Sequence, residues 1–167
     1  MARGSSGLEF FVIGPRTEHA VRLEEQVRNR AGPANLHFLG YVPSPAEAIR
    51  QVDLVVCLSA VAESFGRTIA EGMAAGRPVI AYKWGAIPEL IRHGTDGYLI
   101  PYLNYKQALE YLETLLDYPE KGLEMGRNGR QRAKQLFSPG VFTLQLNYIY
   151  REILDLWKAR EHSHDHP

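Results

Sequence analysis

The sequence predicts an α/β fold in which a parallel sheet lies between layers of helices, followed by a region of helices alone. Up to residue 100, short apolar runs alternate with longer segments that have helical spacing. Each run is too uniformly apolar for a sheet with one wet face, which favours parallel strands covered on both faces. Beyond Pro101 the apolar spacing is helical throughout, so the additional helices follow the sheet.

Five strands are expected from these apolar runs. Gly14-Pro15 closes the first run and Gly40 closes the second, as turn-forming residues do. The third run contains the single cysteine of the chain, Cys57, and is the most apolar. The expected strands are residues 8–13, 36–39, 53–58, 78–81 and 97–100.

Capping residues mark the starts of the intervening helices. Thr17 precedes a segment with helical apolar spacing and is expected to be its N-cap. Ser44 and Glu47 form a capping box, in which each side chain bonds the other residue's main-chain amide. A third helix is expected over residues 66–75, and Gly76 ends it.

The region after Pro101 predicts three amphipathic helices. The last one, opened by Ser138-Pro139, has an apolar face along its whole length, and an exposed face of this kind could promote self-association. The middle helix is basic, which fits either a solvated face or a weak contact with an anionic membrane. Its basic residues are Lys121, Arg127, Arg130, Arg132 and Lys134.

Composition limits the class of protein. Lys plus Arg equals Asp plus Glu, so the formal net charge is zero, and we expect no nucleic-acid partner. One cysteine excludes an intrachain disulfide and suits a reducing compartment, so we expect a cytoplasmic protein. The sequence has no uncharged apolar run of 18 residues, so we expect no transmembrane helix. Cys57 is interpreted as a small buried hydrophobe rather than a nucleophile.

The two ends of the chain are expected to lie outside the folded domain of residues 8–157. Residues 1–7 resemble an expression linker. Residues 158–167 are expected to form a flexible tail, and its histidines either fray with the terminus or capture a metal. These histidines are His162, His164 and His166.

The loop before the third helix is the strongest candidate for a ligand site. In an open parallel sheet, ligands bind beyond the carboxyl ends of the strands. The amides of Gly66, Arg67 and Thr68 are among the unpaired donors at the start of the expected helix. An anion there gains the helix dipole, and Gly66 has no side chain to block it. A phosphate group therefore fits this turn.

Two glutamates flank this turn, and each can hold a sugar. A carboxylate accepts hydrogen bonds from a pair of sugar hydroxyls, so Glu71 could bind one sugar and Glu63 a second, on either side of a diphosphate. This arrangement describes a nucleotide-sugar. The alternative is that Glu63 interacts only with the helix dipole and Glu71 is a plain surface residue.

Several motifs of other enzyme classes do not occur in the sequence. No G-x-G-x-x-G follows the first strand and there is no G-K-[ST], which disfavours a redox dinucleotide and a P-loop. There is no D-x-D to clamp a diphosphate through a metal, and no G-x-S-x-G. We therefore expect no metal and no cofactor, and the nucleotide-sugar would be a substrate.

The segment from Glu63 to Ile100, ESFGRTIAEGMAAGRPVIAYKWGAIPELIRHGTDGYLI, resembles the C-terminal half of retaining glycosyltransferases of the GT-B fold, family 4. Their signature is two glutamates separated by seven residues, here Glu63 and Glu71. Similarity extends upstream to NLHFLGYVPSPAEAIRQVDLVVCLS and downstream to FSPGVFTLQLNYIYREIL. The resemblance implies a Rossmann-like donor-binding domain, one half of a GT-B fold.

This resemblance also implies roles for individual residues. Glu71 would bind the ribose of a UDP-, GDP- or ADP-sugar, and Glu63 would contact the transferred sugar as the catalytic residue. Gly14 would lie near the phosphates. The remaining donor-binding residues would be Leu39, Gly40, Tyr41, Ser64, Phe65, Gly66, Arg67 and Thr68.

The sequence departs from the family pattern in ways that affect its expected activity. We expect this sequence to lack the family's N-terminal acceptor domain, its opening strand and the cationic pair that grips the diphosphate. Ala86 stands where a second glycine is common. We therefore expect the donor-side fragment of a transferase, itself nearly inactive. A nucleotide-sugar epimerase of the same fold and a non-catalytic interaction module are the alternatives.

Overall fold

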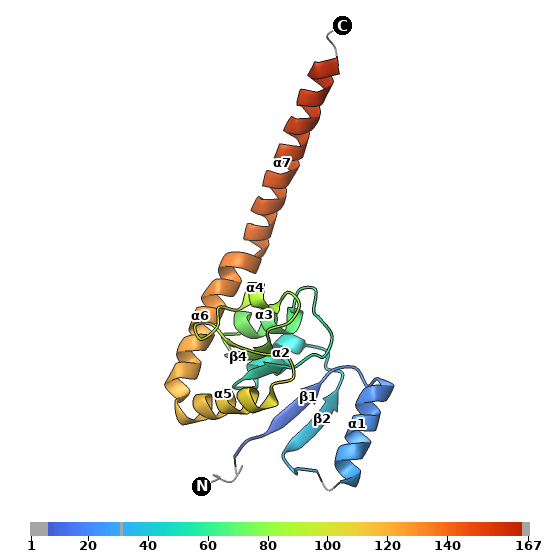
Figure 1. The fold of residues 1–167 in the computed structure, drawn as a ribbon, viewed down its shortest axis with the longest axis vertical. Coiled ribbons are helices and arrows are strands. Elements are labelled where there is room, and N and C mark those ends of the chain that lie inside the picture. The colour runs from blue at the N-terminus through green and yellow to red at the C-terminus, as the bar shows by residue number, and fades with distance from the viewer. Residues whose placement is uncertain (1–6, 31, 165–167) are drawn as a thin grey trace. The chain divides into compact units, whose positions relative to one another are not determined.

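The computed structural model describes residues 7–30 and 32–164. The chain divides into two compact units, Met1–Ala48 and Ile49–Pro167. Unit 1 contains a two-stranded parallel sheet and unit 2 a three-stranded parallel sheet (Figure 1). The predicted α/β class, with parallel strands and further helices after them, is confirmed. The predicted linker, apart from Gly7, lies outside the described residues.

Unit 1 is a single strand–helix–strand crossover. Strand β1 (Phe10–Ile13) pairs in parallel with β2 (Leu36–Gly40), and helix α1 (Glu18–Asn29) connects them. The Thr17 hydroxyl accepts a hydrogen bond from the amide of Ala20, which confirms the predicted cap. This cap satisfies one of the amides that a helix start leaves without a partner.

The expectation that every strand is covered on both faces is wrong for β1. Its four side chains, from Phe10 to Ile13, are 39–45% exposed. Helix α1 has no buried residue. One short helix cannot cover both faces of even a two-stranded sheet, so the apolar strand sequence by itself does not produce burial here.

Unit 2 has the buried sheet that the sequence predicts. Its central strand is β4 (Val79–Tyr82), with β3 (Val55–Cys57) on one side and β5 (Tyr98–Ile100) on the other. Val55 pairs with Val79, and Ile80 pairs with Tyr98. All four residues of β4 are buried. Continuous burial is typical of a central parallel strand.

Helices cover both faces of this sheet, and alternate residues of β4 face them. Val79 and Ala81 belong to a core cluster with Ile69 and Met73 of α3 (Arg67–Ala74). The other two β4 residues belong to a second cluster that α5 (Tyr105–Asp117) closes. Because side chains alternate across a strand, β4 contributes equally to both clusters.

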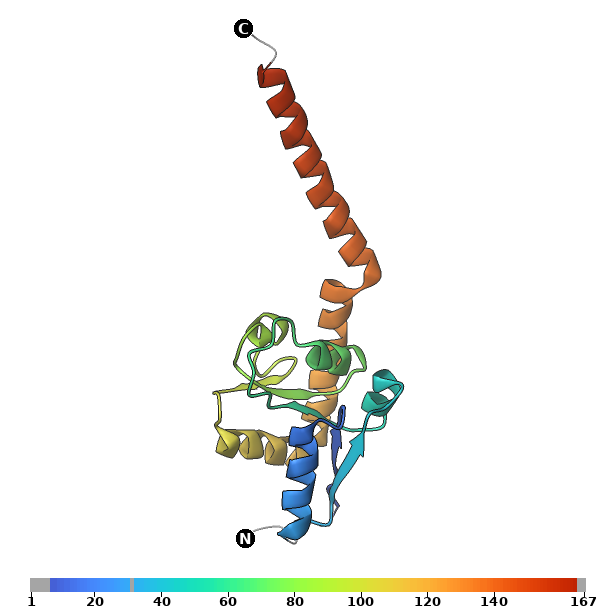
Figure 2. The same ribbon diagram turned by 90° about the vertical axis from the view of Figure 1, so that its right-hand side faces the viewer.

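Three further helices complete the described part of unit 2. The short α4 (Ile87–Leu90) follows β4 and was not expected from the sequence. Helix α6 (Pro119–Phe137) packs along α3, and α7 (Pro139–His164) begins where α6 ends, after Ser138 (Figure 2). Helices α6 and α7 lie in the region after Pro101 that was predicted to contain helices alone.

Helix α7 leaves its apolar side chains in water. The described side chains from Phe142 to Trp157 are all exposed. The predicted apolar face is therefore present, and none of the described residues covers it. None of the helices in the described part of the chain is both long and apolar enough to span a membrane. The predicted histidine tail lies outside the residues whose side chains the structure describes.

Helix α2 (Pro45–Arg50) follows the predicted capping box. The Ser44 hydroxyl lies 3.4 Å from the amide of Glu47 and accepts its hydrogen bond. The side chain of Ile49 is buried in the same core cluster as Val55. A local sequence signal therefore determines the start of this helix, and Ile49 near its end belongs to the core of unit 2.

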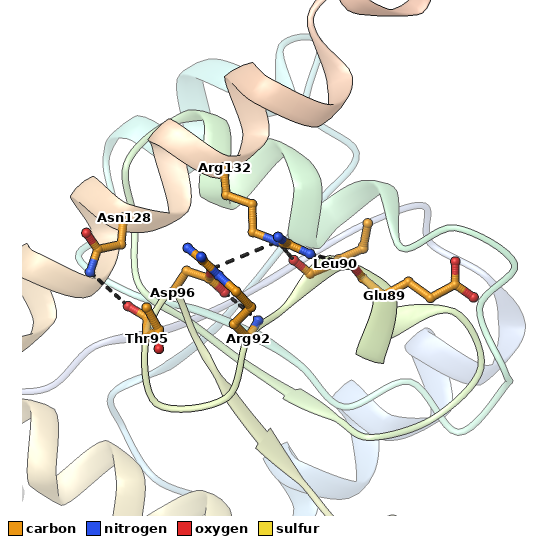
Figure 3. A network of polar contacts seen from close by, with 7 residues as sticks. All are labelled: Glu89, Leu90, Arg92, Thr95, Asp96, Asn128 and Arg132. Atoms are coloured by element: carbon orange, nitrogen blue, oxygen red, sulfur yellow. Dashed lines mark hydrogen bonds and ion pairs between the residues drawn. The ribbon is translucent and has the colours of Figure 1, made fainter. Parts of the chain in front are cut away.

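A buried carboxylate ties α6 to the loop before β5 (Figure 3). Asp96 is fully buried and accepts hydrogen bonds from the amide and the Nε of Arg92, both at 2.6 Å. The Nε of Arg132, on α6, lies 3.9 Å from the same carboxylate and donates to the carbonyl oxygen of Leu90 at 2.6 Å. A buried charge needs such partners. Arg132 therefore binds within the fold and does not belong to a free basic surface.

Candidate functional site

The start of α3 is built around Gly66. This residue is the N-cap, with φ of 87° and ψ of 52°, a left-handed conformation that favours glycine. A Cβ atom at Gly66 would lie 2.3 Å from Cδ1 of Ile87 and 2.9 Å from Cδ1 of Leu90. Both the conformation and the packing on α4 therefore require glycine at this position.

The first turn of α3 presents main-chain donors. The first intrahelical hydrogen bond runs from the amide of Ala70 to the carbonyl oxygen of Gly66, at 3.0 Å. The amides ahead of Ala70 therefore have no partner within the helix. No side chain caps this end. The side chains of Arg67 and Thr68 are exposed, and so are those of Ser64 and Phe65. This turn can accept an anion.

Glu71 lies one turn further along α3 and pairs with Arg67. The Nε of Arg67 donates to Oε1 of Glu71 at 2.7 Å, and the Glu71 side chain is 31% exposed. The spacing of four residues could have indicated this pair from the sequence. Exposed pairs of this kind are worth only about 0.3–0.5 kcal/mol. A ligand hydroxyl can therefore replace Arg67 at little cost.

The main chain of Glu63 is held by the loop that follows β4. The amide of Ala86 donates to the carbonyl oxygen of Glu63 at 2.9 Å. A Cβ atom at Gly85, whose φ is 57°, would lie 2.5 Å from that oxygen. Ala86 itself has a right-handed helical conformation, with φ of −80°. Alanine in place of a second glycine therefore causes no strain, and Gly85 alone provides the close approach.

The side chain of Glu63 lines a shallow hollow at the carboxyl ends of β3 and β4. Its carboxylate Oε1 lies 3.9 Å from Sγ of Cys57, within hydrogen-bonding range of a thiol. Glu63 is half-buried. The hollow is lined by Cys57, Ser59, Val61, Glu63, Tyr82, Trp84 and Ile87.

All residues that line this hollow, apart from Glu63, were not predicted as site residues, and four of them have polar or reactive side chains: Cys57, Ser59, Tyr82 and Trp84. They share one signal, because each lies at or just beyond the carboxyl end of β3 or β4. Burial raises the pKa of the Cys57 thiol, and the neighbouring Glu63 carboxylate adds to this effect. Cys57 is therefore a neutral thiol facing Glu63.

Tyr82 forms the floor of the same hollow. It is 2% exposed, and burial, with the nearby Tyr105 hydroxyl, raises its pKa to about 12. Its ring makes an edge contact with the ring of Tyr102 at 5.3 Å. Tyr82 therefore stays neutral at physiological pH and acts as a packing residue under the site.

Four predicted donor-binding residues belong to unit 1, and the structure relates them only to one another. The amide of Gly14 donates to the carbonyl oxygen of Gly40 at 3.0 Å, and both glycines line a hollow beside Arg16. Leu39 and Tyr41 are 52% and 75% exposed. The role of these four residues at the same site as Glu63 remains a prediction.

The described residues contain no group of three or more His, Cys, Asp or Glu side chains placed to hold a metal ion. The described part of the site thus offers main-chain amides, two carboxylates, a thiol and aromatic rings. Such groups can bind an anion and hydroxyl groups together. The site residues that the sequence predicted in unit 2 all lie in the loop before α3 or in α3 itself.

Comparisons with known proteins identify the family of this chain. Residues 4–132 match the family model described as glycosyl transferases group 1. The N-acetyl-alpha-D-glucosaminyl L-malate synthase of Bacillus anthracis is 34% identical over 126 residues, covering 72% of this chain and 33% of that protein.

Solved structures share the fold. The C-terminal domain of a glycosyl transferase group 1 family protein, LpcC of Francisella tularensis, is 28% identical with a TM-score of 0.63, covering 73% of this chain and 64% of that one. Anabaena HepE, crystallised with UDP-glucose, is 24% identical with a TM-score of 0.78, covering 86% of this chain and 41% of that one. The HepE likeness is evidence for the fold alone.

The chain spans about a third of the length of the curated Bacillus anthracis relative that it matches. The family model nevertheless covers more than half of the chain, including the segment from Glu63 to Glu71. The predicted family is therefore confirmed: this chain belongs to the glycosyl transferases group 1 family, and its fold is that of a GT-B C-terminal domain.

Proposed function

We propose that this chain is the donor-binding half of a retaining glycosyltransferase, which moves a sugar from a nucleoside diphosphate to an acceptor hydroxyl. The observation that carries the proposal is the uncapped start of α3 at Gly66, with Glu63 before it and Glu71 after it. Family membership supports the reaction class. UDP-glucose is the first donor to test, since it is bound in the HepE crystal structure.

In this proposal the diphosphate lies on the amides of Gly66, Arg67 and Thr68. The amides and the dipole of α3 stabilise the negative charge that develops on the leaving diphosphate. Because the main chain at Gly66 is fixed by packing on α4, these donors need no rearrangement during the reaction. Fixed dipoles of this kind contribute most when the charge is greatest.

The two carboxylates have different tasks. Glu71 accepts hydrogen bonds from the ribose hydroxyls and exchanges its weak bond with Arg67 for them. Glu63 accepts from hydroxyls of the transferred sugar in the hollow that it shares with Trp84. Hydrogen bonds to a charged group are worth about 1.5–3 kcal/mol each.

Several finer properties belong to the proposal and are supported only by the sequence and by its resemblance to the family. These are retention of anomeric configuration, chemistry without a metal or cofactor, and a cytoplasmic location. We also propose that residues 8–157 form the donor-binding domain and that the acceptor is bound by a separate N-terminal domain. Gly14, Leu39, Gly40 and Tyr41 would then contact the donor.

Two partner surfaces are part of the proposal. The exposed apolar face of α7 would support self-association. A peripheral membrane contact through α6 has less support, because Arg132 binds main-chain oxygens and Lys121 lies 5.6 Å from the centre of the Tyr98 ring. Light scattering and vesicle co-sedimentation would measure each property separately.

Calorimetric titration of this chain with UDP, GDP, ADP and their sugars tests the proposal. Glu71→Ala should weaken the nucleoside diphosphate and the nucleotide-sugar alike, whereas Glu63→Ala should weaken only the nucleotide-sugar. Glu110→Ala is the matched control, since Glu110 also pairs at four-residue spacing on an exposed helix face.

Two results would refute the proposal. If no nucleotide binds at millimolar concentration, the site at α3 is wrong. If both variants weaken both kinds of ligand equally, the division of tasks between the glutamates is wrong. Transfer by the isolated chain should be nearly undetectable with a panel of acceptors, and robust turnover would show that no further domain is needed.

A further inference from the structure

Two exposed aromatic rings stack on each other, and one of them shares the hollow of Glu63. Trp84 and Tyr102 are 41% and 40% exposed, and their rings stack with centroids 4.9 Å apart and planes inclined by 19°. Trp84 lines the hollow that contains the Glu63 carboxylate. Large aromatic rings with polar atoms at one end are enriched where proteins bind partners.

The ring pair is fixed from below. Tyr82 is buried under the hollow, and its ring makes an edge contact with Tyr102. The hydroxyl of Tyr102 donates to the carbonyl oxygen of Ala60 at 3.3 Å, in the loop that leads to Glu63. The rings therefore do not need to be ordered when a ligand arrives, which reduces the entropic cost of binding.

The ring pair and Glu63 are also joined through the main chain. Trp84 is followed directly by Gly85 and Ala86, which hold the main chain of Glu63 by close approach and a hydrogen bond. Together with the hydrogen bond from Tyr102 to Ala60, these contacts fix the ring pair relative to the main chain of the loop that carries Glu63. Such fixed geometry favours one ligand shape.

The chemistry of the hollow fits a pyranose. A pyranose ring has a face of C–H groups that packs on an aromatic ring, and a rim of hydroxyls that donate to a carboxylate. Trp84 provides the first surface, and Glu63 provides the acceptor. A nucleobase would also stack on Trp84, but it does not present the several hydroxyl donors that a carboxylate prefers.

We propose that the Trp84–Tyr102 pair is a stacking platform for a pyranose ring whose hydroxyls bind Glu63. This inference deepens the proposed function and depends on it. The pyranose is either the sugar of the donor or a sugar on the acceptor, and the two share the same recognition chemistry.

Tryptophan fluorescence of this chain tests the platform. The sequence has two tryptophans, so Trp157→Phe on the exposed part of α7 leaves Trp84 as the only one. UDP-glucose and GDP-mannose are titrated beside UDP and GDP, and methyl α-D-glucopyranoside is titrated alone. Calorimetry on the same samples records whether each compound binds.

We expect at least one nucleotide-sugar to change the Trp84 emission more than its own nucleoside diphosphate does. This result places the sugar of the donor on the platform. A response to the methyl glycoside alone places an acceptor sugar there. If both nucleoside diphosphates bind and no sugar affects Trp84, the platform is refuted while the proposed function stands. If nothing binds, both fail.

Substitutions separate a binding role from a structural one. Trp84→Ala should raise the Kd of the responding ligand about three- to tenfold and leave that of the sugar-free diphosphate within about twofold. Trp84→Phe should restore part of the affinity, and Trp157→Ala should change nothing. Equal losses for sugar and diphosphate in Trp84→Ala, or no loss for either, would overturn the proposal.

Discussion

The two sheets of this chain are built from strands of similar composition, yet they differ in burial. The residues of β1 are Phe-Phe-Val-Ile and those of β4 are Val-Ile-Ala-Tyr, but β1 is 39–45% exposed whereas no β4 side chain exceeds 2%. Strand β4 has a neighbour on each side and a helical layer on each face. An apolar run therefore predicts a strand, while the covering layers decide whether it is buried.

The same difference separates the two candidate ligand regions. In unit 2, residues at the carboxyl ends of β3 and β4 are held by core packing and by main-chain contacts around Glu63. In unit 1, Leu39 and Tyr41 project into solvent. The buried sheet of unit 2 thus fixes the positions of its site residues, and the sheet of unit 1 does so only for Gly14 and Gly40.

The largest expected effect is on stability, and it is seen when isoleucine is replaced by alanine in each of the two sheets. Ile80→Ala in β4 should lower the free energy of unfolding by about 2–5 kcal/mol, because it leaves a cavity in a covered core. Ile13→Ala in β1 should cost about 1 kcal/mol or less, since Ile13 is 39% exposed. Urea unfolding followed by circular dichroism measures both. Equal costs would show that β1 is covered in solution.

A smaller effect is expected at the buried carboxylate of unit 2. Asp96→Asn should lower the free energy of unfolding by about 1.5–3 kcal/mol, because it weakens the bonds to Arg92 and Arg132. Asp155→Asn, at an exposed position on α7, is the control and should stay within about 0.5 kcal/mol of the parent. If the two variants unfold alike, the contact between α6 and the loop before β5 is unimportant for stability.

The smallest effect concerns the thiol at the end of β3. Burial raises the pKa of Cys57, so at pH 8 less thiolate is present and iodoacetamide should react more slowly than with a free thiol. Glu63→Gln removes a neighbouring negative charge, which lowers that pKa and should speed the reaction. Because Cys57 is the only cysteine, mass spectrometry follows it alone. Unchanged rates would mean that the two groups do not interact in solution.

Much of the fold could be predicted because its signals are local. The strands were expected within two residues of their observed ends, and Thr17 and Ser44 cap the helices that they precede. The strands depend on apolar runs, and each cap depends on a hydroxyl that lies three residues before the amide that it binds. The short α4 was missed because its four residues give no periodicity.

The candidate site was predictable only in part, for a physical reason. The spacing of Glu63 and Glu71 and the glycine at 66 are visible in the sequence. The contact between Cys57 and Glu63, and the position of Trp84 beside them, arise where the ends of separate strands meet. Such contacts depend on sheet order and loop geometry, which no local pattern determines. The exposure of β1 depends on how many helices and strands cover its sheet, which no local pattern determines either.

The amides at the start of α3 provide the decisive measurement. Nuclear magnetic resonance spectra of the ¹⁵N-labelled chain, recorded while UDP-glucose is added, should show the largest shift changes at Gly66, Arg67 and Thr68. Smaller changes are expected at Glu63 and Trp84, and none on α7. If the chemical shifts of those three amides do not change while the ligand saturates another region of the chain, a diphosphate does not bind at this helix and the proposed site is wrong.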